Sequence, residues 1–236
     1  MMTLSPNNLK NWLKQSSNPH HQKLFSLLKS IRTFDIPTPK ALNKALYFLL
    51  ILTRNFLSNV TRIFLYTPAF KGRVHSCGKN LYLYTGIPFI SGPLSIDIGE
   101  NCRISGQTTF SGRSTSHNPS LTIGNNVGIG WQTTIAVGTQ IVIGNNVRIA
   151  GRSSLFGYSG HPFDAKKRAA GDPDLSNQIG DITLEDDVWL GSNVTVNKGV
   201  TIGKGTIVAT GSVVTKSLPC FVLAAGNPAK IIRAIG

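Results

Sequence analysis

The sequence predicts a parallel β-helix that follows an N-terminal helical region, and a repeating pattern of apolar residues carries most of this prediction. Aliphatic or aromatic residues recur at a step of six within each of five groups of three. A sustained six-residue period is a signature of a parallel β-helix. A sandwich of short strands would instead alternate with a period of two and have irregular turn spacing. The groups are Ile98, Ile104, Phe110; Ile123, Ile129, Ile135; Ile143, Ile149, Leu155; Leu184, Leu190, Val196; and Ile202, Val208, Val214.

The interruptions of this period predict how the coils are built. They fall between positions 110 and 123, 135 and 143, and 155 and 184, and they exceed six residues by 7, 2 and 23. Each interruption follows the third member of a group. If three hexads complete one coil of a triangular prism, every insertion leaves from the same corner, and about five coils result. Turns rich in asparagine and glycine fit such corners, because both residues tolerate a left-handed backbone.

The first 70 residues are predicted to be helical and to form a region separate from the β-helix domain at 71–236. Apolar residues recur there at spacings of three and four, most regularly over residues 40–66. Prolines stand just before and just after this segment, where a helix begins and ends. We also expect a short helix at the C-terminus and a catalytic loop at 156–181.

The charge balance favours anionic partners. The formal net charge is +14, from 24 Lys and Arg against 10 Asp and Glu. On a helix with about 100° per residue, Lys40, Lys44, Arg54 and Arg62 fall within an arc of roughly 80°, opposite bulky apolar residues. We expect this helix to dock on an anionic membrane surface, or else to pack on the β-helix or on a neighbouring subunit. Nucleic acid is not expected, since neither an aromatic-basic platform nor a helix-turn-helix pattern accompanies the charge.

The N-terminus and the cysteines point to the cytoplasm. The N-terminus lacks the basic head and apolar run of a signal peptide. The longest apolar run, Ala45 to Leu52, is too short to span a bilayer. Cys77, Cys102 and Cys220 form no CxxC pair, so they suggest neither a zinc site nor a disulfide framework. We therefore expect a cytoplasmic protein at the inner face of the cell membrane.

The candidate catalytic residue is His161, near the start of the longest insertion. It follows Leu155 by one hexad, where a loop leaves the rigid prism. A histidine in that position suits acid or base work, because its charge changes near neutral pH. A solvated loop histidine without a role is the alternative.

Three ordered segments resemble the hexapeptide-repeat sugar and polysaccharide O-acetyltransferases, of the galactoside and maltose acetyltransferase type. They cover about 140 residues, and Arg168 follows the histidine of the first segment by seven positions. The segments are Ser159-Gly160-His161-Pro162; Asp187-Val188-Trp189-Leu190-Gly191 with Gly199-Val200-Thr201-Ile202-Gly203; and residues 210–216 with 225–233.

The resemblance implies a left-handed β-helix, a homotrimer with active sites between subunits, and acetyl-CoA as the donor, with no metal. In such an enzyme His161 is the general base, and the acceptor oxygen attacks the thioester directly. The resemblance also implies that Ser192 is an oxyanion donor and that Trp189 lines the channel of the acetyl group. The remaining residues that it assigns to CoA are Gly191, Thr210, Thr215, Lys216, Lys230 and Arg233.

The acceptor side departs from this family. Simple sugar acetyltransferases carry an Asn and a nearby acidic residue in the coil before the catalytic one. Residues 131–139 contain neither, and they begin with Trp131, which with Arg168 is our candidate for acceptor binding. A larger or lipid-linked glycan therefore suits the sequence better than galactoside or maltose.

Three other functions share this scaffold. An N-acetyltransferase of an amino-sugar nucleotide uses the same donor and the same base. A non-catalytic scaffold would not need His161 in its motif. A metalloenzyme of the carbonic anhydrase type needs three histidine ligands, and the coil region offers only His117 and His161, on different insertions.

Overall fold

The structure is a computed structural model that describes residues 6–236, so the first five residues of the predicted helical region lie outside it. By its contacts the chain divides into two compact units, Met1–Thr53 and Arg54–Gly236. The change from helix to strand comes later, between Arg73 and Ser76. The last turns of the long helix therefore belong to the same unit as the β-helix.

The first unit contains a helical hairpin and the start of a long helix. α1 (Pro6–Gln15) and α2 (Pro19–Arg32) are joined by a short turn, in which the side chain of Asn18 caps α2 by accepting from the backbone N–H of His20. Leu13 is buried between the two helices, where its side chain is 3% exposed. Trp12 and His21 also contact each other across the turn, with ring centroids 4.4 Å apart.

The long helix runs unbroken through α3 (Lys40–Thr61), the π-helical turn η1 (Arg62–Tyr66) and α4 (Thr67–Arg73). It has 34 residues, with a mean hydropathy of 1.2 over its most apolar window, so by length and composition it could cross a membrane. This revises the expectation drawn from the run Ala45 to Leu52, because the helix stays apolar on average well beyond that run. At its end Phe70 is fully buried in the core of the second unit.

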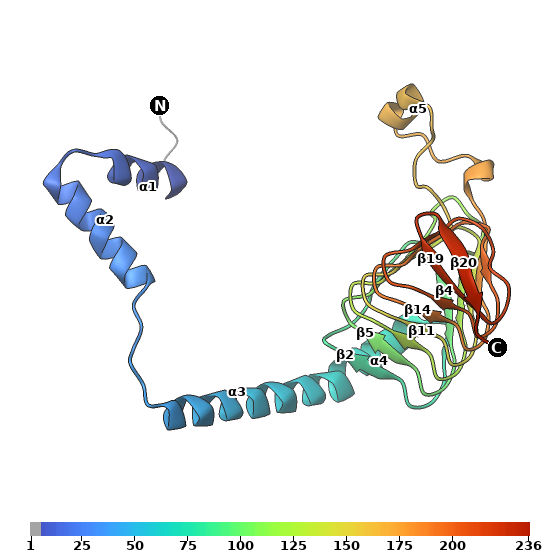
Figure 1. The fold of residues 1–236 in the computed structure, drawn as a ribbon, viewed down its shortest axis with the longest axis horizontal. Helices are drawn as coiled ribbons and strands as arrows, with labels where there is room; N and C mark the ends of the chain where they lie inside the picture. Colours follow the sequence, from blue (N-terminus) through green and yellow to red (C-terminus); the bar gives the residue numbers. More distant parts are fainter. Residues whose placement is uncertain (1–5) are drawn as a thin grey trace. The chain divides into compact units, whose positions relative to one another are not determined.

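The second unit is a parallel β-helix, as predicted (Figure 1). Three sheets form its faces, and successive coils contribute one strand to each. Sheet A has the order β1-β4-β7-β10-β13-β16, sheet B the order β2-β5-β8-β11-β14-β17-β19-β20, and sheet C the order β3-β6-β9-β12-β15-β18. The strands are β1 Ser76–Cys77, β2 Tyr82–Tyr84, β3 Phe89–Ser91, β4 Ser95–Ile98, β5 Arg103–Ser105, β6 Thr109–Gly112, β7 Ser120–Ile123, β8 Gly128–Ile129, β9 Thr134–Val137, β10 Gln140–Ile143, β11 Arg148–Ile149, β12 Ser154–Phe156, β13 Ile182–Leu184, β14 Trp189–Leu190, β15 Thr195–Asn197, β16 Thr201–Ile202, β17 Ile207–Val208, β18 Val213–Val214, β19 Val222–Gly226 and β20 Ala229–Ala234.

The residues of the six-residue period form the core. Ile123 pairs in register with Ile98 and Ile143, and Ile135 pairs with Phe110 and Leu155. All fifteen residues of the five groups are buried. Each buried aliphatic side chain contributes roughly 1.5–3 kcal/mol of hydrophobic stabilisation, so the repeat seen in the sequence is also the main source of stability.

One further coil precedes those that the sequence predicts. It consists of β1, β2 and β3, whose residues Cys77, Leu83 and Ile90 pair with Ile98, Ile104 and Phe110 of the next coil. Its spacing is irregular, because the steps along the chain lengthen from six to seven and then to eight residues before Ile98 is reached. The regular six-residue repeat therefore starts only at the second coil of the structure, and the sequence pattern does not predict the first.

The corner between sheets A and B has the left-handed backbone that the turns predict. Asn126, Asn146 and Asp187 occupy it in successive coils with φ of 54°, 59° and 62°. Their side chains also form a ladder. The amide of Asn126 donates to Asn146 Oδ1 and that of Asn146 donates to Asp187 Oδ1, both at 2.9 Å. The asparagine turns thus supply both the corner conformation and hydrogen bonds between coils.

The prediction of a short C-terminal helix is wrong, because the chain ends in two strands, β19 and β20. β19 continues sheet B in parallel, and β20 returns antiparallel to it after a turn in which Gly226 has φ of 110°. Ile231 and Ile232 are β-branched and favour a strand. The last strand of the β-helix would otherwise present unpaired N–H and C=O groups, which β20 covers on one side.

Candidate functional site

The three insertions of the sequence leave from one corner, as predicted. Each joins a strand of sheet C to the next strand of sheet A: β6 to β7, β9 to β10 and β12 to β13. The longest insertion, residues 157–181, contains α5 (Ala165–Ala170) and the 3₁₀ turn η2 (Ser176–Gln178). An antiparallel bridge between Tyr158 and Ile179 closes its base. Gly138 of the short insertion packs so closely there that a Cβ would lie 2.5 Å from the carbonyl oxygen of Gly157.

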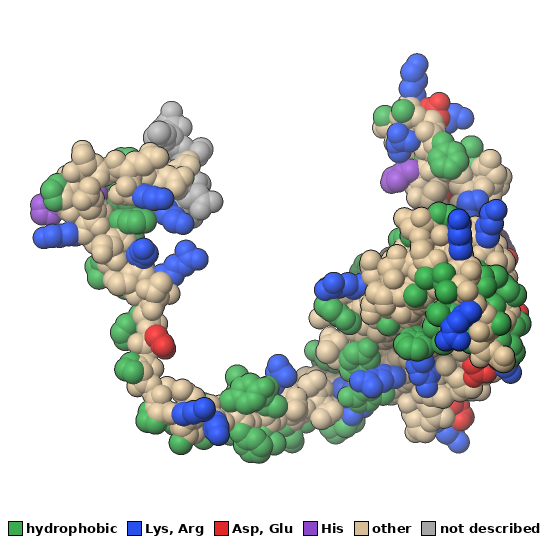
Figure 2. Space-filling view, in the orientation of Figure 1, with side chains coloured by type: hydrophobic (Ala, Val, Ile, Leu, Met, Phe, Trp, Pro, Cys, Tyr) green, Lys and Arg blue, Asp and Glu red, His purple; other side chains and the backbone are tan. Residues whose placement is uncertain are grey.

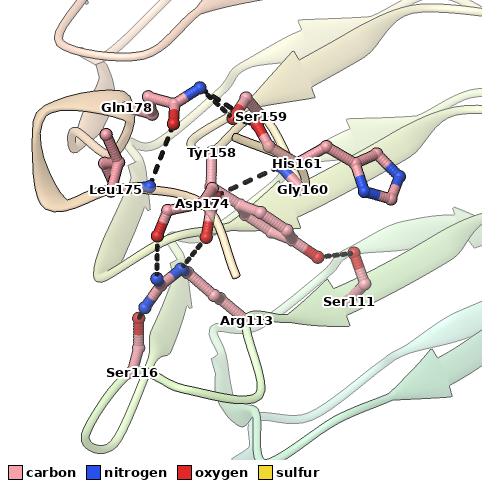
Figure 3. A network of polar contacts seen from close by, with 10 residues as sticks. All are labelled: Ser111, Arg113, Ser116, Tyr158, Ser159, Gly160, His161, Asp174, Leu175 and Gln178. Carbon is pink, nitrogen blue, oxygen red and sulfur yellow. Dashed lines mark hydrogen bonds and ion pairs between the residues drawn. The ribbon is translucent and has the colours of Figure 1, made fainter. Parts of the chain in front are cut away.

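The backbone on both sides of His161 is held by buried side chains (Figure 3). On one side, the N–H of Gly160 donates to Asp174 Oδ2 at 3.1 Å. On the other, the carbonyl oxygen of His161 accepts from Gln178 Nε2 and from Ser159 Oγ, each at 3.0 Å. Asp174 and Gln178 are 6% and 1% exposed. The peptide groups next to the histidine are therefore fixed from inside the loop.

Asp174 is in turn held by Arg113 of the first insertion. Arg113 Nε lies 2.6 Å from Asp174 Oδ1, and a terminal nitrogen of the guanidinium donates to the Asp174 carbonyl oxygen at 2.9 Å. The two side chains are only 11% and 4% exposed. A buried charge pair of this kind is stable only when further hydrogen bonds satisfy both partners, and here the backbone of the long loop supplies one of them.

The imidazole of His161 points away from this network. It is exposed, and within residues 6–236 it makes no hydrogen bond to another protein group. Nearby, the Tyr158 hydroxyl lies 3.4 Å from Ser111 Oγ. A histidine with a fixed backbone and free ring nitrogens can exchange a proton with a bound molecule. Arg168, on α5, donates to the carbonyl oxygens of Pro162 and Phe163 at 3.1 and 3.0 Å, and so ties down the chain that follows.

Most of the residues that the sequence assigns to CoA lie away from the loop that carries His161. Trp189 is on the outer face of sheet B, where its side chain is 52% exposed. It borders a hollow of about 470 Å³ together with Tyr84, Gly128 and Arg148. A Cβ on Gly128 would lie 3.3 Å from Arg148 Cδ, so a side chain there would have to displace the guanidinium chain that lines the hollow. The hollow thus combines aromatic surface with positive charge.

Trp131, Gly191, Ser192 and Thr210 stack at the corner between sheets B and C. A Cβ on Gly191 would lie 2.7 Å from the backbone nitrogen of Thr210, so the close stacking of these coils requires a glycine. Trp131 is 45% exposed, and the guanidinium carbon of Arg152 lies 4.9 Å from its ring centroid.

The other CoA candidates lie further along the prism. Thr215 and Lys216 follow β18, at the corner that carries the His161 loop in an earlier coil. Lys230 and Arg233 are exposed on β20.

One chain therefore does not bring all predicted site residues together. His161 leaves the C–A corner, whereas Ser192 and Trp131 lie at the B–C corner, on the opposite edge of sheet C. A site that uses both sets would need residues from two copies of the chain.

Two thiols are poor candidates for chemistry. Burial raises the pKa of Cys102 and of Cys77 above the usual value for cysteine, and Cys102 is only 1% exposed. Protonated thiols are weak nucleophiles and weak metal ligands. Among the described residues no group of three His, Cys, Asp or Glu side chains is placed to hold a metal ion.

Sequence reasoning missed Arg113, Asp174 and Gln178. Arg113 and Asp174 are 61 positions apart, and neither belongs to a motif or to the six-residue period. The one signal in the sequence was that all insertions leave from one corner, which places residues 113–119 next to residues 157–181.

Comparisons with known proteins agree with this fold. The family described as bacterial transferase hexapeptide (six repeats) matches residues 181–216. Over 113 residues the chain is 38% identical to the Saccharomyces cerevisiae protein "Putative acetyltransferase YJL218W". The match covers 48% of this chain and 55% of that protein, so the chain spans about half the length of this curated relative.

Solved structures give a similar picture. AntD, an N-acyltransferase from Bacillus cereus, was solved in complex with dTDP and 3-hydroxybutyryl-CoA. It has a TM-score of 0.57 and 21% identity, and the alignment covers 72% of this chain and 88% of AntD, which shows the shared fold. A galactoside acetyltransferase in complex with coenzyme A is 29% identical over 72% of this chain and 70% of that chain, with a TM-score of 0.48.

Proposed function

We propose that this chain, which carries the hexapeptide repeat of the bacterial transferases, moves the acetyl group of acetyl-CoA to a hydroxyl of a sugar or surface-polysaccharide precursor. One observation carries the proposal. The backbone of His161 is fixed on both sides by buried side chains, while its imidazole is left free toward solvent. The 38% identity to a protein named as an acetyltransferase supports the reaction class.

In the proposed reaction His161 acts as general base. A ring nitrogen takes the proton of the acceptor hydroxyl while the oxygen attacks the carbonyl carbon of the thioester. The C–S bond then breaks, and the thiolate of CoA takes up the proton from the imidazolium, so that an acetyl ester and free CoA result. A hydroxyl is a poor nucleophile at neutral pH, and a positioned base is what this step requires. Ser192 or backbone N–H groups would stabilise the oxyanion.

The charges of the predicted donor site suit CoA, which carries several phosphate groups. Lys216, Lys230 and Arg233 are exposed cations at the far end of the prism, and Arg148 lines the hollow beside Trp189. Cations of this kind bind phosphate through charge-assisted hydrogen bonds. The exposed ring of Trp189 offers an apolar surface to the uncharged part of the molecule.

The function is tested by following release of the CoA thiol from acetyl-CoA with a panel of acceptors. The panel should include methyl glycosides, oligosaccharides and nucleotide-activated amino sugars. We expect thiol release that depends on the acceptor. Calorimetry with CoA alone adds an independent measurement, because a non-catalytic scaffold would neither bind CoA nor release thiol.

The bond in the product separates O-acetylation from N-acetylation. We expect an ester, which mild alkali hydrolyses within minutes, whereas an amide survives the same treatment. Mass spectrometry before and after alkali would show the loss of one acetyl group from the product. An alkali-stable product on an amino sugar would overturn the O-acetyl assignment and leave acyl transfer itself intact.

We further propose that the enzyme is a homotrimer with sites between copies. The separation of His161 from Trp189 and Ser192 within one chain supports this. Sedimentation should show a trimer. Inactive His161→Ala and Trp189→Ala variants should also regain activity when they are denatured and refolded together, up to about a quarter of wild type for random assembly of a closed ring. An active monomer, or a mixture without recovery, would contradict shared sites.

A further inference from the structure

The N-terminal helices expose a large apolar surface. No residue of α3 is buried. Phe48, Phe56 and Phe64 are 69%, 66% and 77% exposed, and leucines between them are half exposed. Figure 2 shows hydrophobic side chains gathered along this helix. Apolar surface of this extent on a soluble protein indicates a partner.

The same segment carries a large share of the positive charge. Residues 1–61 contain eight Lys and Arg and one acidic residue, Asp35, which gives a formal charge of +7 out of +14 for the chain. On α3, Lys40, Lys44 and Arg54 lie within an arc of roughly 80°, which Tyr47 and Ile51 share. The residues on the opposite side are Leu42, Leu46, Leu49 and Phe56. A basic face opposite an apolar face is typical of helices that lie in the interface of an anionic bilayer.

Basic and apolar side chains also lie close together on the α1–α2 hairpin. Its two helices enclose a cleft of about 350 Å³. Apolar side chains and three cations, Lys10, Lys29 and Arg32, line this cleft together. Such a cleft fits an anionic lipid, because the apolar side chains can contact the acyl chain while the cations bind the acidic headgroup. The apolar residues of the cleft are Leu9, Leu13, Phe25 and Leu28.

We propose that α1, α2 and α3 dock the protein on a bilayer that contains anionic phospholipid, lying in the interface rather than crossing it. The position of Arg54 decides between these two orientations. If the helix 40–73 crossed the bilayer, Arg54 would lie near the centre, at a cost that lowers insertion by roughly 70-fold or more. In the interface its guanidinium faces the headgroups, where each cation strengthens binding about fivefold.

The test is flotation of the full-length protein with vesicles. Vesicles of phosphatidylcholine with 30% phosphatidylglycerol are compared with phosphatidylcholine alone, at low and at high salt. We expect the protein to float with the anionic vesicles at low salt, to remain behind with neutral vesicles, and to be released by high salt, because surface charges are screened. Association that survives high salt and alkaline carbonate would show a membrane-spanning helix and overturn the interfacial orientation.

Matched variants identify the surface. Lys44→Gln with Arg54→Gln should weaken association about thirtyfold, at about fivefold per cation. Lys79→Gln with Lys204→Gln removes the same charge from the β-helix, where both residues are exposed, and should leave association unchanged. Equal weakening by the two pairs would show a general charge effect and overturn the assignment to the helices.

A second variant tests the apolar face of α3, which a second copy of the chain could cover instead of a bilayer. Leu49→Ser with Phe56→Ser, two exposed residues of the side opposite the cations, should weaken vesicle association and leave the oligomeric state unchanged. If the wild-type protein ignores anionic vesicles at low salt, and this variant instead lowers the oligomeric state in sedimentation, a second copy of the chain covers the face and the proposal is wrong. Neither readout needs acetyl transfer, so the docking proposal can fail or hold independently of the proposed function.

Discussion

Replacing His161 with alanine should lower the rate of acetyl transfer by about two to four orders of magnitude, because removal of a general base typically has an effect of that size. The fold should survive, since the imidazole makes no hydrogen bond to another described residue. The measurement is CoA thiol release with the best acceptor of the panel. His161→Gln should be equally slow, because glutamine can accept a hydrogen bond but cannot carry the proton.

His117 offers a matched control for this prediction. It is an exposed histidine on the neighbouring insertion, residues 113–119. His117→Ala should retain wild-type turnover. Binding of CoA to the His161 variants should also remain near wild type, which separates loss of the base from loss of the donor site. Wild-type turnover in purified His161→Ala would exclude this residue as the base.

Replacing Arg113 with methionine should release the loop that carries His161. Asp174 would be left buried without its partner, and breaking a buried pair in this way costs about 3–5 kcal/mol. Because the pair joins two surface insertions, we expect local opening of residues 157–181 rather than unfolding of the coils. Hydrogen exchange should show faster exchange in the peptide that contains Gly160, whose N–H donates to Asp174. Turnover should fall while CoA binding changes little.

Two variants show whether the pair itself is responsible. Ser116→Ala removes a more distant partner of Arg113, at 3.3 Å, and should change neither exchange nor turnover. Arg113→Met combined with Asp174→Asn removes both charges and keeps an oxygen that can accept from the Gly160 N–H. This double variant should restore part of the lost protection, since no buried charge then remains unpaired. Unchanged exchange in Arg113→Met would show that the pair does not hold the loop.

The sequence alone predicted the β-helix because its coils are a local repeat. An inward residue such as Ile129 must be apolar in every coil, and a corner residue such as Asn146 must tolerate a left-handed backbone, so both requirements recur along the chain at a fixed step. The first coil was not predicted because the spacing between its inward residues lengthens to seven and then eight residues. The C-terminal hairpin was not predicted because β20 pairs antiparallel with β19 only once, at the open edge of sheet B, and this pairing is not part of the six-residue repeat.

Most of the candidate site was decided by the tertiary structure. The sequence identified His161 from its motif and from its place in the longest insertion. It could not identify Arg113, Asp174 and Gln178, which meet only because three insertions leave from the same corner of the prism. Their contacts join positions up to 61 residues apart and follow no period. Periodic packing is visible in one dimension because each coil repeats it, whereas a single buried ion pair between loops is specified only once, by the three-dimensional path of the chain.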